Sequence, residues 1–514
     1  MTALLAGPCD RGVATAARAE VHPHPRATLA ATILGSSIAF IDGSVVNVAL
    51  PALGHDFGAS AAGLVWTINA YLLPLGALIL IGGGAGDHFG RRRLFMIGLA
   101  TFTVASIACA TAPTLAWLMG GRAVQGLGAA LLMPNSLAIL GATFTGATRG
   151  RAIGTWAATG ALAGALGPLA GGWLVDTIGW RMVFLLNLPI AAAAGYLAWA
   201  YVAETRDGNQ ASPLDWAGAA LATAGLGSLT WALTAASGVG ASLSVISIAA
   251  AAGTFLLLSF IWVESRLGDR AIMPLSMFAT RAFAGLTLLT LFLYGSLGGL
   301  VVLLPFMLIK LANWSAVAAG AALLPIPLLI GLGSPLMGGI TGKFGGRWPL
   351  AIGSGIVALG MALYARAGPG SIDYWRDILP ATVFVGLGLA VSVAPLTTTV
   401  MASVEPDHVG TASGFNSAVA RIAGLVATAL LGFVFALQGS AEAFAAGFRV
   451  AAVVGSVSAA VAAGCAMMLI RSIPGPTLAA PPEAPGCERN APVVGCTQER
   501  CHCAEIQDPP LWTG

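Results

Sequence analysis

The sequence predicts an all-α membrane protein with fourteen transmembrane helices, built as two six-helix pseudo-repeats with an inserted central helix pair. The composition, the number of long apolar runs and the similarity of two glycine-rich turns support this fold class. Of the 514 residues, 57% are hydrophobic and only 9% are charged, whereas a soluble domain carries about 25% charged residues. The net charge is only +3 and the basic residues are scattered, so no nucleic-acid partner is expected.

Fourteen apolar runs are long enough to cross a bilayer, which takes about 20 residues. They lie at 28–50, 63–83, 94–112, 115–140, 152–175, 182–203, 216–236, 243–263, 283–309, 315–339, 348–366, 378–402, 409–437 and 444–470. Backbone groups cannot stay unpaired in hydrocarbon, so each run is expected to be a helix. A membrane β-barrel would instead show short alternating runs, which are absent.

The runs divide the chain into five expected parts. These are a cytoplasmic N-tail (1–27), a first six-helix bundle (28–203), an inserted two-helix linker region (204–282), a second six-helix bundle (283–473) and a disordered cytoplasmic tail (474–514). No cleavable signal sequence precedes the first run. The C-terminal tail is polar and rich in proline, and the spacing of its four cysteines fits no common zinc site. No metal site is therefore predicted, and the role of this tail stays open.

The basic residues predict how the helices are oriented. With the N-terminus inside, seventeen of the 24 Lys and Arg residues fall in inner segments and four fall in outer ones. Cytoplasmic loops carry an excess of Lys and Arg. We therefore expect a multi-pass protein of the plasma membrane with both termini in the cytoplasm.

An internal repeat supports the division into two bundles. Leu50-Pro51 and Leu304-Pro305 are each followed, at nearly the same distance, by a glycine-rich turn that begins at Gly83 or at Gly338. Duplication of a six-helix unit leaves this kind of trace. The two runs between the halves, 216–236 and 243–263, are interpreted as an insertion.

The turn after the second run combines glycines with a cationic cluster. Its characteristic residues are Gly83, Asp87, Gly90, Arg91 and Arg92. The glycines allow a sharp turn and a close approach of helices. The arginines hold the turn in the cytosol, and Asp87 is placed at a helix end, where it can pair with an arginine or with the N-terminus of another helix.

Two charged residues lie well inside runs of the first bundle. Asp42 is in the first run, and Arg122 is in the fourth, within Arg122-x-x-Gln125-Gly-x-Gly. Both lie seven or eight residues from the outer end of their run, which places them at about the same depth, ~10–12 Å below the outer surface. An ionised side chain at such a depth costs about 2.5–3.5 kcal/mol and indicates a function.

The fifth run carries closely spaced small residues around a proline. The residues are Gly160, Gly164, Gly167, Pro168, Gly171 and Gly172. Glycines four apart let helices pack closely, and a proline inside a helix frees a carbonyl and permits a bend. This run is therefore expected to lie tightly against a neighbouring helix.

Together these stretches resemble the major facilitator superfamily, and within it the fourteen-span drug:proton antiporters. The resemblance implies that Asp42, Arg122 and Gln125 serve proton coupling in a central cavity, where Asp42 and Arg122 face each other. It also implies that the turn at Gly83, Asp87, Gly90, Arg91 and Arg92 latches the cytoplasmic gate against the start of the run near Val409. The glycine series from Gly164 to Gly172 is typical of exporters in that family.

The resemblance implies a secondary transporter that exports drug-like or antibiotic amphiphiles in exchange for protons by alternating access. Its expected partners are a small lipophilic substrate, protons and the lipid bilayer, with the monomer as the functional unit. The second bundle holds no carboxylate away from the ends of its runs, so neutral, zwitterionic or anionic substrates are expected over dications. No phosphate-binding loop or catalytic motif occurs, so neither a cofactor nor enzymatic activity is predicted. A proton-coupled transporter of a metabolite (an amino acid, a sugar or a siderophore) is the alternative, followed by a non-transporting sensor.

Overall fold

The computed structural model describes residues 24–206, 215–236, 241–268, 271, 273, 275–366, 373–404, 409–436 and 440–470. Within these ranges the chain is almost entirely helical and contains no strand. Fourteen helices in the described part are long and apolar enough to cross a membrane. The predicted fold class is therefore confirmed. The N-terminal tail and the cysteine-containing C-terminal tail lie outside the described residues.

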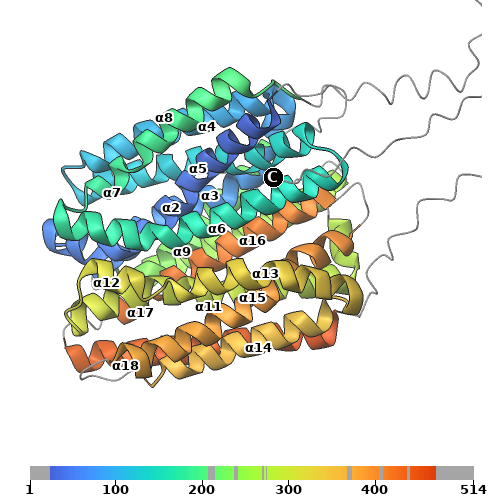
Figure 1. The fold of residues 1–514 in the computed structure, drawn as a ribbon. Helices are drawn as coiled ribbons and strands as arrows, with labels where there is room; N and C mark the ends of the chain where they lie inside the picture. The colour runs from blue at the N-terminus through green and yellow to red at the C-terminus, as the bar shows by residue number, and fades with distance from the viewer. Residues whose placement is uncertain are drawn as a thin grey trace, which may run out of the picture. The chain divides into compact units, whose positions relative to one another are not determined.

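The first repeat contains six membrane spans, of which the last is divided into two helices (Figure 1). Its helices are α2 (Pro25–Phe57), α3 (Ala61–Phe89), α4 (Arg91–Ala110), α5 (Leu115–Thr143), α6 (Gly146–Thr177), α7 (Met182–Leu185) and α8 (Asn187–Tyr201). The inserted pair is α9 (Trp216–Ala236) and α10 (Leu243–Leu267), which is followed by the short η2 (Leu275–Ala279).

The second repeat also contains six spans. Its helices are α11 (Arg281–Leu311), α12 (Ala316–Ala321), α13 (Pro325–Phe344), α14 (Arg347–Tyr364), η3 (Tyr374–Ile378), α15 (Leu379–Ala402), α16 (Val409–Leu430), α17 (Gly432–Phe435) and α18 (Ala441–Leu469). The inserted pair packs against itself, and α9 also contacts α3 and α16.

Packing within the two repeats follows the same plan, as a duplicated unit requires. In the first repeat α2 packs on α6 and α8, while α5 packs on α3 and α4. In the second repeat α11 packs on α16 and α18, while α15 packs on α13 and α14. The repeats meet where α3 contacts α16, where α6 contacts α12 and α13, and where α2 contacts α11.

Hydroxyl side chains begin several of these helices. Ser60, Thr114, Thr280, Ser315 and Ser440 each accept a hydrogen bond from the backbone amide three residues further on. Such a cap satisfies one of the amides that the first turn of a helix leaves unpaired. With these caps, the helices start close to the predicted starts of the runs.

Two predicted spans are interrupted by proline. The run at 315–339 forms α12 and α13, with Pro325 beginning the second helix, and the run at 182–203 forms α7 and α8, with Pro189 close to the break. Proline has no amide hydrogen and cannot continue the hydrogen bonding of the preceding turn. Both prolines thus separate a short helix from the longer one that follows it.

Candidate functional site

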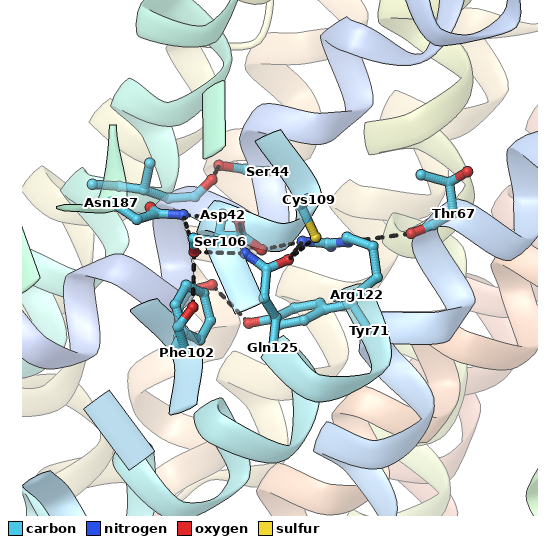
Figure 2. Close-up of polar contacts among 12 residues, drawn as sticks. Asp42, Ser44, Thr67, Tyr71, Phe102, Ser106, Cys109, Arg122, Gln125 and Asn187 are labelled. Atoms are coloured by element: carbon cyan, nitrogen blue, oxygen red, sulfur yellow. Dashed lines mark hydrogen bonds and ion pairs between the residues drawn. The ribbon is translucent and has the colours of Figure 1, made fainter. Parts of the chain in front are cut away.

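A buried ion pair joins α2 and α5 inside the first repeat. The guanidinium of Arg122 donates a hydrogen bond from Nη1 to Oδ2 of Asp42 (Figure 2). The side chains are 0% and 1% exposed for Asp42 and Arg122, respectively. The two membrane charges that the sequence placed at one depth are therefore in direct contact.

Two amides complete the coordination of the Asp42 carboxylate. Its Oδ1 accepts hydrogen bonds of 3.1 Å from Nδ2 of Asn187 and from Nε2 of Gln125. Both amides also donate to the Ser106 hydroxyl, at 3.3 Å from Asn187 and 2.9 Å from Gln125. Ser106 in turn donates to the carbonyl of Phe102 at 2.9 Å. The carboxylate is thus held directly by groups from α5 and α8, and Ser106 of α4 binds the two amides (Figure 2).

The Arg122 guanidinium makes further contacts besides the one with the carboxylate. Its Nη1 also donates to Oε1 of Gln125 at 2.9 Å, and its Nε donates to the carbonyl of Thr67 at 3.3 Å. The guanidinium carbon lies 4.4 Å from the centre of the Tyr71 ring and 6.0 Å from that of Phe184. A cation over an aromatic face gains about 0.5–2 kcal/mol.

This arrangement can respond to a single proton. Removing one partner of a buried pair leaves an uncompensated charge, at a cost of about 3–5 kcal/mol. A proton on Asp42 would remove the negative charge and leave Arg122 without its counter-ion.

The ion pair is enclosed by other side chains of the first repeat. Asp42, Arg122 and Gln125 are all fully buried among the helices of the first repeat. The reason is the layer of side chains around them, since Tyr71 covers one face of the guanidinium and its hydroxyl donates to the carbonyl of Ala39 at 3.0 Å. In this structure the pair is closed off from solvent.

Three residues of this hydrogen-bond network were not predicted from the sequence. Asn187, Ser106 and Tyr71 are completely or almost completely buried. The available signal was a polar side chain inside an apolar run, which indicates a partner because an unpaired polar group in hydrocarbon is costly.

The glycine series of α6 has two faces. A Cβ at Gly167 would lie 2.1 Å from Oγ of Ser44, and one at Gly171 would lie 2.2 Å from Cγ2 of Val45, so both glycines face α2. A Cβ at Gly172 would instead lie 2.4 Å from the carbonyl oxygen of Ala316 in α12. Gly164 has ordinary contact, 3.8 Å from the carbonyl oxygen of Phe40.

Pro168 takes part in the same contact between the repeats. A Cβ at Gly320 of α12 would lie 2.3 Å from the carbonyl oxygen of Pro168. With Gly172 and Ala316, this makes a backbone-to-backbone contact of α6 with α12. The contact is at the end of the bundle opposite the α3–α4 turn.

In the α3–α4 turn, the charged residues pair locally. Nε of Arg91 donates to Oδ1 of Asp87 at 2.8 Å, and Nη2 of Arg92 donates to the carbonyl of Trp199 at 2.8 Å. The Glu204 carboxylate accepts from the amides of Arg92 and Arg93 at 3.0 and 3.1 Å, so it caps α4. The chain at 405–408 and the side chain of Val409 lie outside the described residues, so the predicted acceptor of the latch is not described.

Two glycines of this region make closer contacts than Gly83. A Cβ at Gly83 would lie 3.4 Å from Pro134, which is ordinary contact. A Cβ at Gly82 would lie 2.0 Å from the carbonyl oxygen of Ala130, and one at Gly86 would lie 1.6 Å from Oδ1 of Asn135. The close approach of α3 to α5 therefore depends on Gly82 and Gly86. Gly90 has a φ of +108°, which favours glycine.

Among the residues that the structure describes, no three His, Cys, Asp or Glu side chains gather where they could hold a metal ion. Deep in the first repeat, Asp42 and Arg122 pair with each other. Together with Gln125, Asn187 and Ser106 they form what is called here the Asp42 network. A bundle of membrane helices in two repeats, with a buried ion pair at membrane depth, defines the class of helical membrane transporters.

The comparisons with known proteins identify the family. The model described as Major Facilitator Superfamily matches residues 32–428. The chain belongs to this superfamily.

Curated relatives of the chain are resistance proteins. The chain is 35% identical over 417 residues to Multidrug resistance protein Stp of Mycobacterium tuberculosis, covering 80% of this chain and 75% of the relative. It is 31% identical over 430 residues to the Tetracenomycin C resistance and export protein of Streptomyces glaucescens, covering 83% and 78%. It is 33% identical over 414 residues to Puromycin resistance protein pur8 of Streptomyces alboniger, covering 80% and 82%.

Solved structures share the fold at low sequence identity. A bacterial homologue of the human lysosomal transporter Spinster, in an inward-facing and occupied conformation, superposes with a TM-score of 0.61 at 16% identity, over 87% of this chain and 96% of that one. A peptide transporter POT in complex with sulfate gives a TM-score of 0.62 at 16% identity, over 85% and 92%.

Proposed function

We propose that this protein is a secondary transporter of the plasma membrane that exports drug-like or antibiotic amphiphiles in exchange for protons. The superfamily and the resistance and export names of its relatives support export of small molecules. The buried Asp42–Arg122 pair is the single observation that carries the proton coupling, because one proton on a buried acid that is paired with a cation changes the local charge.

The proposed cycle uses the Asp42 network as a two-state element. With Asp42 ionised, the carboxylate holds α2, α4, α5 and α8 together through Arg122, Gln125, Asn187 and Ser106. A proton taken from the outside neutralises Asp42, weakens these hydrogen bonds and lets the helices shift. Release of that proton to the cytoplasm restores the ion pair, and the proton gradient thereby drives the cycle in the export direction.

Alternating access would open and close the two ends of the repeat interface in turn. At one end, we infer that the α6–α12 contact at Gly172, Ala316 and Gly320 closes the bundle. At the other end, we infer that the turn carrying Asp87 and Arg91 closes the cytoplasmic gate. Gly167 and Gly171 leave room for Ser44 and Val45 of α2, and we infer that α6 shifts against α2 at this close contact.

The orientation follows from the distribution of charge. We infer that both termini are cytoplasmic, because Lys and Arg are concentrated in the segments on that side. The monomer is proposed as the working unit, since each chain carries both repeats and the complete Asp42 network. We propose neither ATP hydrolysis nor another catalytic reaction for this chain. A metabolite transporter is the less favoured alternative, because the relatives reported above are named for resistance.

The test is a proton-release assay in inverted membrane vesicles that contain the protein. A proton gradient is established, and lipophilic antibiotics of different charge are added one at a time while the internal pH is followed. Export predicts that at least one compound class dissipates the gradient in vesicles with the protein and leaves it intact in vesicles without it. Dissipation by amino acids or sugars but by no antibiotic would support the metabolite transporter instead.

A further inference from the structure

A second cation lies deep in the bundle, in the second repeat. Arg421 is on α16, within the candidate span Thr411–Phe435. It is ten residues from the beginning of that span, which places its backbone about 15 Å along the helix and near the middle of the hydrocarbon. The position is costly for a cation and therefore indicates a function.

The Arg421 side chain is directed at the first repeat. Its Nη2 lies 3.7 Å from Sδ of Met133 in α5, and its guanidinium carbon lies 5.8 Å from the centre of the Phe40 ring in α2. A Cβ at Gly76 of α3 would lie 3.3 Å from Cβ of Arg421. Three helices of the opposite repeat therefore surround this residue.

Arg421 differs from Arg122 in its partners. Arg122 has a carboxylate, an amide and a carbonyl as hydrogen-bond acceptors, and it is fully buried. Arg421 has a thioether and an aromatic face, and no described acid pairs with it. Its side chain is only partly buried. One guanidinium is thus neutralised within the protein, and the other retains its charge at a partly open position.

A polar stripe runs along α16 on either side of Arg421. Ser413 and Ser417 precede it at intervals of four residues, and Thr428 follows two turns later. Residues three or four apart share one face of a helix. The hydroxyl of Thr428 reaches Asn69 of α3, so the stripe faces the first repeat. Ser417 is exposed one turn from Arg421, and its hydroxyl donates to the carbonyl of Ser413 at 3.0 Å.

We propose that Arg421 binds the anionic group of the exported molecule, an aromatic amphiphile that carries one carboxylate or an equally acidic group. The inference rests on the proposed function and names the class of substrate. A guanidinium pairs with a carboxylate through two parallel hydrogen bonds. The Phe40 ring and the Met133 thioether supply apolar contacts beside it. The anionic group of the exported molecule thus supplies the negative charge that no described side chain supplies to Arg421.

A binding measurement with a matched pair of probes tests this inference. The probes are 1-pyrenebutyric acid, which is ionised at neutral pH, and its uncharged amide. Each is titrated against the purified full-length protein in lipid nanodiscs, and the quenching of protein fluorescence gives Kd. The unmodified protein is expected to bind the acid at least about tenfold more tightly than the amide, as a charge-assisted bidentate pair provides.

Three variants test whether Arg421 causes the preference for the acid over the amide. Arg421→Gln is expected to bind the acid and the amide equally, with the affinity for the amide unchanged, which also reports that the variant is folded. Arg421→Lys is expected to keep a reduced preference. Lys310→Gln is the matched control, since it removes one positive charge from an exposed position at the end of α11 and should change neither Kd.

Several results would overturn the inference. These are equal affinity of the unmodified protein for both probes, no binding of the acid, or an undiminished preference in Arg421→Gln. The result is separate from the proposed function, because binding is measured without a proton gradient. A protein that prefers the acid through Arg421 but never exchanges protons for antibiotics would contradict the exporter and leave the anion site in place.

Discussion

Oδ2 of Asp176 accepts a hydrogen bond of 2.9 Å from the backbone amide of Val317, on the opposite repeat. Oδ1 of the same carboxylate accepts a second one, of 3.1 Å, from the amide of Ala316. Asp176 is near the end of α6, and the two amides belong to the first turn of α12. A carboxylate at the N-terminus of a helix satisfies free amides and interacts favourably with the helix dipole. This contact must break whenever that end of the transporter opens.

Removal of the Asp176 carboxylate should favour the conformation that is open at this end. Asp176→Ala loses both hydrogen bonds, a cost of about 1–2 kcal/mol for the closed state, or a population shift of about tenfold. Spin labels on the adjacent ends of α6 and α12 would report longer distances in the variant. Asp56→Ala is the control, because its partners Trp180 and Arg181 are in the same repeat. Unchanged distances in Asp176→Ala would contradict this role.

A methyl group at Gly172 should impair the same closure. The added Cβ would lie 2.4 Å from the carbonyl oxygen of Ala316, so α6 and α12 must separate. Overpacking of this kind costs about 1–3 kcal/mol. Gly172→Ala is expected to lower the export rate in vesicles at least several-fold at equal protein level. Gly164→Ala adds the same group at an ordinary 3.8 Å contact and should export at nearly the normal rate. Equal rates for the two variants would refute the close contact as the cause.

A methyl group at Gly90 should destabilise the α3–α4 turn. The residue has a φ of +108°, and its Cβ would lie 2.7 Å from Oε1 of Glu204. Strain of this kind costs about 1–3 kcal/mol. Gly90→Ala should therefore lower the midpoint of thermal unfolding of the purified protein. Gly58 has a φ of +56°, but a Cβ at this residue would have no atom within 4 Å. Gly58→Ala should therefore lower the midpoint of thermal unfolding less than Gly90→Ala does. The reverse order of the two midpoints would show that Glu204 does not restrict the turn.

Replacement of Arg122 should separate stability from coupling. Arg122→Ala leaves Asp42 as an uncompensated buried charge, with a loss of stability of about 3–5 kcal/mol, and little folded protein is expected in the membrane. The double variant Asp42→Asn with Arg122→Gln removes both charges and should recover the protein level but not proton-driven export. Protein level by immunoblot and export in vesicles measure the two effects. Normal levels of Arg122→Ala would mean that Asp42 does not depend on this partner.

The spans and the main charged residues could be predicted from the sequence, because the bilayer sets the length of each apolar run and makes a charge within a run rare. Every membrane helix needs a long apolar run, so the fourteen spans could be counted directly. A charge inside such a run is rare, so Asp42 and Arg122 were evident, and their equal depth followed from the helical rise. The internal repeat followed from two similar turns, and the packing of α3 on α5 and of α13 on α15 agrees with it.

Features that depend on side-chain packing could not be predicted. Asn187 becomes a partner of Asp42, and Ser106 a partner of Asn187, only through the arrangement of α4 and α8, which no spacing along the chain reveals. The contact of the Tyr71 ring with the Arg122 guanidinium likewise depends on how α3 packs on α5. Glycines that face another backbone, such as Gly82 and Gly86, cannot be told from neighbouring glycines without knowing which helix lies opposite.

The coupling role of Asp42 is tested most directly by reconstituting Asp42→Asn in liposomes and comparing two kinds of transport of one exported antibiotic. Exchange of labelled for unlabelled antibiotic across the membrane requires binding and alternating access but no net movement of protons. Accumulation against a gradient requires proton coupling. Because Asn cannot carry the proton, the variant should keep exchange at a rate comparable to that of the unmodified protein and lose proton-driven accumulation. Undiminished proton-driven accumulation in Asp42→Asn would contradict the proposed mechanism.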